Sequence, residues 1–140
     1  MNYLTSRFLW LTSIMVFFAA ASPAYAAPKA ACEVLPAAQA QRILGFPVKA
    51  SGSKITGNVP GTTGTQCDYI GNHGGAPARL SVVTAASPAA AALAMQKMSA
   101  VGLPAWAMAQ KGASFLIAGA GDPPNRKMIK QMLAVGLKSL

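Results

Sequence analysis

Side chains that could carry acid–base chemistry are few in this 140-residue chain. It contains one histidine, His73, in the glycine-rich stretch 71–75, and three acidic residues that lie far apart: Glu33, Asp68 and Asp122. Acid–base catalysis needs such groups within hydrogen-bond reach of the reacting atoms, and a serine or cysteine nucleophile needs a base beside it. No spacing in the sequence pairs these residues. We therefore predict a protein that is not an enzyme, with a hydrolase assembled by the fold as an alternative.

The methionines raise the question of a metal site. Met95 with Met98, or Met128 with Met132, could place two thioethers on one helix face, and soft sulfur together with His73 would suit Cu(I). Methionines at helical spacing more often fill gaps in a hydrophobic core. We therefore predict core packing for them, with neither a bound metal nor a cofactor.

The first 26 residues have the pattern of a secretory signal peptide. Arg7 gives a positive start, residues 8–21 are apolar, and Ala24-Tyr25-Ala26 supplies the small residues of a cleavage site. A membrane-spanning helix needs about 20 apolar residues, so an uncleaved anchor is the weaker alternative. This pattern predicts a bacterial protein that is periplasmic or secreted.

Export bears directly on the two cysteines, Cys32 and Cys67. Residues 27–140 are then expected to form one domain without a transmembrane segment, and outside the cytoplasm an even pair of cysteines is expected to be oxidised. Lipoprotein processing at Cys32 is disfavoured because Lys29 stands where an apolar residue is needed. We therefore predict a Cys32–Cys67 disulfide that closes a loop of about 36 residues.

The chain is strongly basic, with a formal net charge of +9 at pH 7. A basic protein is attracted to anionic surfaces, which indicates an anionic envelope component or an acidic protein as a partner. Nucleic acid is disfavoured, because single-strand binders combine cations with stacking aromatics and the aromatics here are isolated. The candidate binding residues are Tyr69, Trp106, Arg126, Lys127 and Lys130. The alternative interpretation is that the two aromatics are buried in the core and that the three cations are solvated on the surface of a helix.

Helix and strand signals alternate from residue 27 onward. Pro36 suits the first position of a helix that Gly45 ends, and Asp122 suits the cap of the last helix. The expected elements, in chain order, are a helix over 36–44, a weak strand over 48–56, a loop over 57–64, strands over 66–70 and 78–84, a helix over 88–101, strands over 106–110 and 114–118, and a final helix after Asp122.

The order α-β-β-β-α-β-β-α predicts an α+β fold. Short turns between consecutive strands imply hairpins and therefore an antiparallel sheet. We expect a two-layer sandwich in which the helices lie on one face of this sheet.

Three short segments of the chain form a recognisable pattern. They are Cys32-Glu33-Val34-Leu35-Pro36, Leu44-Gly45-Phe46-Pro47-Val48 and Cys67-Asp68-Tyr69. Together they resemble a pattern found in small bacterial exported proteins and lipoproteins of unknown function, in which a Cys-x-Leu-Leu start leads to a Leu-Gly-x-Pro helix end and a Cys-x-Tyr strand. The resemblance implies the cysteine pairing and the α+β layout, and it implies no activity.

The sequence therefore favours a small exported binding or interaction module of unknown ligand. Its site would be an open sheet face or a groove between the sheet and the helices. The alternative is an exported inhibitor or immunity-type protein that blocks an enzyme with a loop, for which Gly57–Gly64 is the candidate.

Overall fold

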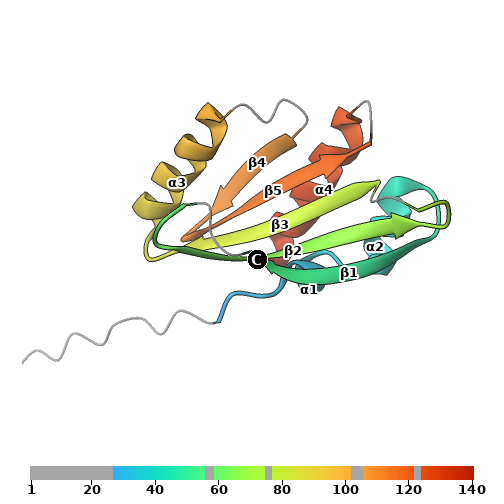
Figure 1. Ribbon diagram of the computed structural model, residues 1–140, viewed down its shortest axis with the longest axis horizontal. Coiled ribbons are helices and arrows are strands. Elements are labelled where there is room, and N and C mark those ends of the chain that lie inside the picture. Colours follow the sequence, from blue (N-terminus) through green and yellow to red (C-terminus); the bar gives the residue numbers. More distant parts are fainter. Residues whose placement is uncertain (1–26, 56–58, 75–76, 102–105, 122–123) are drawn as a thin grey trace, which may run out of the picture.

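The computed structural model describes residues 27–55, 59–74, 77–101, 106–121 and 124–140 (Figure 1). The predicted leader, residues 1–26, lies outside this part of the chain. Among the described helices, none is both long enough and apolar enough to cross a membrane.

The described residues form one five-stranded sheet and four helices. The strands follow the order β1-β2-β3-β5-β4, and every neighbouring pair is antiparallel, so the predicted α+β class and antiparallel sheet are confirmed. The strands are β1 (Val48–Ile55), β2 (Thr62–Gly71), β3 (Ala78–Ala85), β4 (Trp106–Lys111) and β5 (Ser114–Ala120). The helices are α1 (Ala31–Val34), α2 (Ala37–Leu44), α3 (Pro88–Ala100) and α4 (Arg126–Ser139).

One face of the sheet, called the first face here, packs against α1, α2 and α4. Alternate residues of a strand point to opposite faces, so Leu80 and Val82 of β3 reach this side together. They join a core that includes Val34 of α1, Leu116 of β5 and Met132 of α4, all 2% exposed or less. In Figure 1, β5 and β3 pass in front of α4.

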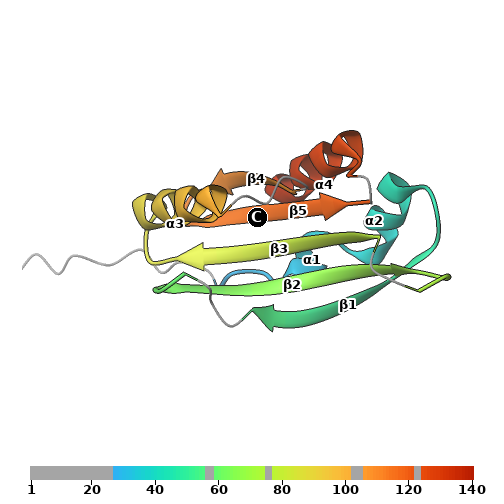
Figure 2. The same ribbon diagram turned by 45° about the horizontal axis from the view of Figure 1, so that its top comes forward.

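Helix α3 packs against the opposite face, called the second face here, so the expectation of helices on one face only is wrong. Its buried residues Ala91 and Ala94 belong to a separate cluster with Val83, Phe115 and Ile117. The physical reason is that β5 is apolar at consecutive positions, which requires cover on both faces. Figure 2 shows α3 beside the β5 end of the sheet, with β1 and β2 extending away from it.

The disulfide between Cys32 and Cys67 is present and joins α1 to β2, with the two Cα atoms 5.1 Å apart. Cys67 is fully buried on the first face, and Cys32 packs against the same core. The predicted cysteine pairing is therefore confirmed.

The helix predicted over 36–44 is present as α2, and the short helix α1 that precedes it was not predicted. Pro36 is the N-cap of α2, in extended backbone, and α1 precedes it. Gly45 ends α2 as expected, with a φ of 81° that favours glycine.

Two further boundaries were predicted wrongly. Strand β2 begins at Thr62, so part of the expected 57–64 loop is sheet, while residues 56–58 lie outside the described part. The cap of α4 is Asn125, whose side-chain oxygen accepts a hydrogen bond from the amide of Met128 at 3.1 Å. Asp122, the expected cap, is outside the described residues. Asparagine and aspartate cap helices equally well, so composition does not choose between the two.

Candidate functional site

Two of the residues singled out in the sequence are aromatic, and the structure places them differently. Tyr69 is fully buried on the first face, where its hydroxyl donates a hydrogen bond of 2.6 Å to the carbonyl oxygen of Leu35. Burial raises the pKa of this phenol well above its ordinary value of 10.0. Tyr69 is thus a core residue and cannot touch a ligand. Trp106 is on the second face and is partly exposed.

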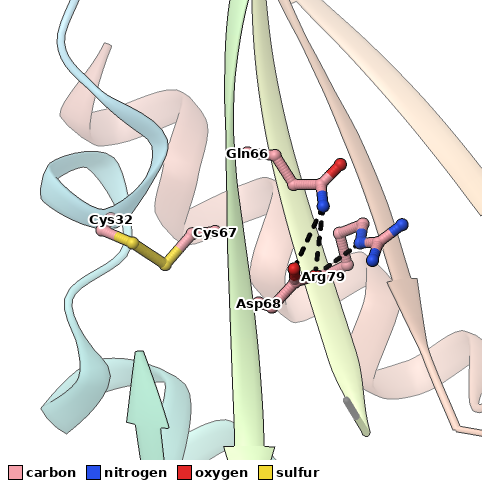
Figure 3. Close-up of polar contacts among 5 residues, drawn as sticks. All are labelled: Cys32, Gln66, Cys67, Asp68 and Arg79. Atoms are coloured by element: carbon pink, nitrogen blue, oxygen red, sulfur yellow. Dashed lines mark hydrogen bonds and ion pairs between the residues drawn. A yellow bond between two sulfur atoms is a disulfide. The ribbon is translucent and has the colours of Figure 1, made fainter. Parts of the chain in front are cut away.

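The second face carries a polar cluster that the sequence analysis did not single out. Asp68 of β2 and Arg79 of β3 are cross-strand partners, and the Arg79 Nε donates to an Asp68 carboxylate oxygen at 2.5 Å. Gln66, two residues earlier on β2, donates from its amide nitrogen to the same carboxylate at 3.1 Å. Figure 3 shows these three side chains on the side of β2 opposite to the Cys32–Cys67 disulfide.

Trp106 extends the cluster across the sheet. Arg79, Gly119 and Trp106 occupy one row on β3, β5 and β4, as the strand register shows. A Cβ at Gly119 would lie 3.1–3.3 Å from three atoms of the indole, so the ring lies face-on across this glycine. The Arg79 guanidinium carbon is 5.8 Å from the ring centroid, within the range of a cation–π contact. Because Gly119 has no side chain, the Trp106 ring can pack against the sheet beside the Asp68–Arg79 pair.

A pocket of about 170 Å³ opens beside Trp106, between α3 and the strands. Its wall is mostly apolar, and Gln66 and Ser81 bring polar groups to its floor. Ser81 is 4% exposed, and among the described residues it is the one polar residue that is buried. The lining residues are Ile55, Val59, Thr62, Thr63, Gly64, Gln66, Ser81, Val83, Met98, Trp106 and Ile117. We call this pocket, together with Asp68 and Arg79, the second-face groove.

In the described part of the chain, the groove combines hydrogen-bonding groups with an aromatic surface, and Asp68 is the carboxylate that it contains. Among described residues, no group of three or more histidine, cysteine or acidic side chains could hold a metal ion. His73 lines a different pocket, and no acidic residue is among the described residues around it. Glu33 accepts a hydrogen bond from the Ala30 amide at the start of α1. The geometry of the second-face groove suits binding through hydrogen bonds and aromatic stacking.

The candidate cations Arg126, Lys127 and Lys130 lie exposed on α4, away from the groove. Asp68–Arg79 is the ion pair found within the described residues, so these three cations have no carboxylate partner there. The structure thus separates two candidate surfaces: the second-face groove, which contains Trp106, and the outer side of α4.

Part of the groove could have been read from the sequence. The alternation of β2 places Gln66 and Asp68 on one side, opposite Cys67 and Tyr69, and the predicted hairpin brings Arg79 onto the adjacent strand. Nothing local in the sequence shows that Trp106, on a later hairpin, shares their row.

No protein-family model, curated protein or solved structure matches this chain. The resemblance to small bacterial exported proteins therefore stays a prediction.

Proposed function

We propose that this protein is a small exported, non-enzymatic binding module, and that its ligand binds in the second-face groove. One observation carries the proposal: the groove brings Gln66, Asp68, Arg79 and Trp106 together beside an apolar pocket while the opposite face is occupied by the core. Binding sites commonly combine a mostly apolar wall with a few oriented polar groups.

The groove residues are held in place before any ligand arrives. Asp68 accepts hydrogen bonds from Gln66 and Arg79, and Trp106 lies on Gly119 within reach of the guanidinium. Holding side chains in their bound orientation lowers the entropy lost on association. This arrangement supports a binding role for Gln66, Asp68 and Arg79, which are polar side chains outside the two hydrophobic clusters.

Export is supported by the leader pattern of residues 1–26 and is compatible with the disulfide. It is tested by the intact mass of protein isolated from the cell envelope, with and without reduction. A mass matching residues 27–140, two protons lighter than the dithiol form, supports cleavage. A retained leader or two free thiols would contradict export.

The binding role is tested with a library of small polar fragments added to the protein recovered after export. Trp106 is then the sole tryptophan, because Trp10 belongs to the leader, so its fluorescence reports on the groove. We expect binding fragments to shift this emission and the backbone NMR signals of Gln66, Ser81 and Met98. Fragments that perturb only distant residues, or turnover of a fragment, would contradict the proposal.

The outer side of α4 supports a second property, electrostatic docking onto an anionic envelope component. Eleven lysines and arginines follow residue 27, against three acids, and Arg126, Lys127, Lys130 and Lys138 are exposed on this one helix. Two other cations gather at its C-terminal end, where Lys29 and Lys111 donate to the carbonyl oxygens of Ser139 and Leu137. Cations close to one another attract an anionic surface more strongly than scattered ones.

Vesicles containing phosphatidylglycerol test this second property. The protein should bind at low salt and release as the ionic strength rises, because screening weakens the attraction between exposed charges. Replacing Lys127 and Lys130 with glutamine should weaken binding more than the charge-matched control, in which Lys49 and Lys97 are replaced. Equal effects of the two pairs would show that total charge, and not the α4 surface, determines binding.

A further inference from the structure

We propose that the second-face groove binds a neutral oligosaccharide, with a sugar ring against Trp106 and its hydroxyls on the Gln66–Asp68–Arg79 cluster. This inference rests on the proposed function, since it assumes that the groove is the binding site. It is carried by three properties of the groove: its charge balance, its hydrogen-bonding capacity and its aromatic surface.

The charge balance selects a ligand without net charge. The Arg79 Nε lies 2.5 Å from the Asp68 Oδ1, and the side chains of Asp68 and Arg79 are 22% and 39% exposed. A carboxylate or phosphate approaching Arg79 would also meet the Asp68 carboxylate, and an ammonium approaching Asp68 would meet Arg79. Burying a charge beside a like charge is unfavourable, whereas a hydroxyl can donate to one partner and accept from the other.

The free hydrogen-bonding groups of the cluster match adjacent hydroxyls. In the described structure the Nε of Arg79 is engaged by Asp68, whereas its two terminal nitrogens form no hydrogen bond with described residues. Gln66 donates through its nitrogen, which leaves its amide oxygen as an acceptor. The planar guanidinium and the carboxylate thus present donors and acceptors in fixed, neighbouring positions. Vicinal hydroxyls of a sugar, each both donor and acceptor, fit this alternation.

The aromatic surface suits the apolar side of a sugar ring. Trp106 lies with one face on Gly119 and with the Arg79 guanidinium carbon 5.8 Å from the ring centroid, and the side chain is still partly exposed. A pyranose has a side of C–H groups that can pack on an aromatic face while its hydroxyls point to polar neighbours. An indole offers a large apolar area with little conformational entropy to lose.

Trp106 also lies between two hollows, which favours an oligosaccharide over a single sugar. On one side is the 170 Å³ pocket under α3, and on the other is a hollow of about 270 Å³ bordered by Arg79, Gly119 and Gly121. Both are open to the surface and are lined by Trp106, so adjacent units of one chain can occupy them together.

The test is titration of the exported protein with the tetrasaccharides of cellulose, chitin, starch and xylan, followed by Trp106 fluorescence and backbone NMR. We expect at least one of them to give a saturable change with a dissociation constant below about 10 mM. Because the ligand is neutral, the affinity should change less than twofold when sodium chloride is raised to about 0.5 M.

Three groove variants and two control variants make the test specific to the groove. Asp68→Asn and Arg79→Gln should each weaken binding by about tenfold or more, because each removes charge-assisted hydrogen bonds. Arg42→Gln is the matched control for Arg79→Gln, since Arg42 is exposed on α2 beside the first face. Trp106→Ala, which is followed by NMR because it removes the fluorescent residue, should abolish binding. Phe46→Ala, at an exposed aromatic outside the groove, is its control. Circular dichroism of each variant verifies the fold.

The outcomes separate this inference from the function on which it rests. If charged or peptide fragments bind the groove and none of the four tetrasaccharides does, the oligosaccharide inference is wrong and the binding module stands. If neither set perturbs groove residues, both are wrong. Tetrasaccharide binding that survives Asp68→Asn and Trp106→Ala would place the sugar elsewhere and would also overturn the inference.

Discussion

The two faces of the sheet are built by the same strands and are covered by helices to different extents. On the first face, α1, α2 and α4 cover a core in which Tyr69, Leu80 and Met132 are fully buried. On the second face, α3 contacts β3, β4 and β5 and no described helix covers β1 and β2, so that Gln66 and Asp68 stay partly exposed. The β1–β2 side of the second face is therefore less covered than the first face, which leaves it open for the proposed binding.

Strand β2 shows this division within four consecutive residues. Cys67 and Tyr69 are buried on the first face, whereas Gln66 and Asp68 point to the groove (Figure 3). Because alternate residues point to opposite faces, substitutions one position apart should affect different properties. Substitutions at Cys67 and Tyr69 should lower stability, and substitutions at Gln66 and Asp68 should weaken the proposed binding.

The largest effect on stability is expected from removing the disulfide. Replacing Cys32 and Cys67 together with alanine should lower the free energy of unfolding by about 4 kcal/mol, the upper estimate from loop-closure entropy for this separation. Urea unfolding followed by circular dichroism measures the change. Reduced wild-type protein should be destabilised to a similar extent, and a loss under about 1 kcal/mol would mean that packing alone holds α1 on the sheet.

Tyr69→Phe should have the next largest effect. It removes the donor of the 2.6 Å hydrogen bond to the Leu35 carbonyl, in a site that water does not reach. Leaving a buried acceptor without its donor costs about 1–3 kcal/mol. The same urea measurement applies, with Phe46→Ala at a partly exposed aromatic as the control. Oligosaccharide binding should be unchanged, and reduced binding would contradict the separation of the two faces.

The sequence predicted the features that depend on local pattern. Pro36 and Gly45 marked the start and end of a helix, and the alternation around Cys67 indicated a half-buried strand. The antiparallel sheet followed from the turns, and the disulfide from the cysteine count and the expected compartment. The placement of α3 was predicted wrongly, because the apolar run Phe115-Leu116-Ile117 was not read as a strand buried on both faces.

The groove could be predicted only in part, because it depends on long-range register. Alternation places Asp68 beside Gln66, and the hairpin brings it to Arg79. Trp106 reaches their row only because β5 inserts between β3 and β4, and because Gly119 has no side chain beneath the indole. Neither the strand order nor that close contact has a local signal in the sequence.

Alkaline pH provides a graded test of burial on the first face. Burial raises the pKa of Tyr69 above its ordinary value of 10.0, so the folded state keeps a proton that the unfolded chain releases. This contribution is fully present below about pH 10, and it is lost by up to about 1.4 kcal/mol per pH unit as the pH rises further. Urea unfolding of the wild type and Tyr69→Phe at several pH values isolates it, because the lysines titrate in both proteins. A difference between the two that does not change with pH would contradict the burial of this phenol.

The smallest effect on stability is expected from Asp68→Asn, one residue before Tyr69. Asp68 and Arg79 form a partly exposed ion pair, and such pairs contribute about 0–1 kcal/mol because water screens both charges. The free energy of unfolding should therefore fall by less than about 1 kcal/mol, with raised salt reducing even that difference. If the groove binds as proposed, the same substitution should weaken ligand binding about tenfold. A stability loss as large as that of Tyr69→Phe would show that the cluster belongs to the scaffold, because a group kept mainly for binding has little effect on the unfolding equilibrium.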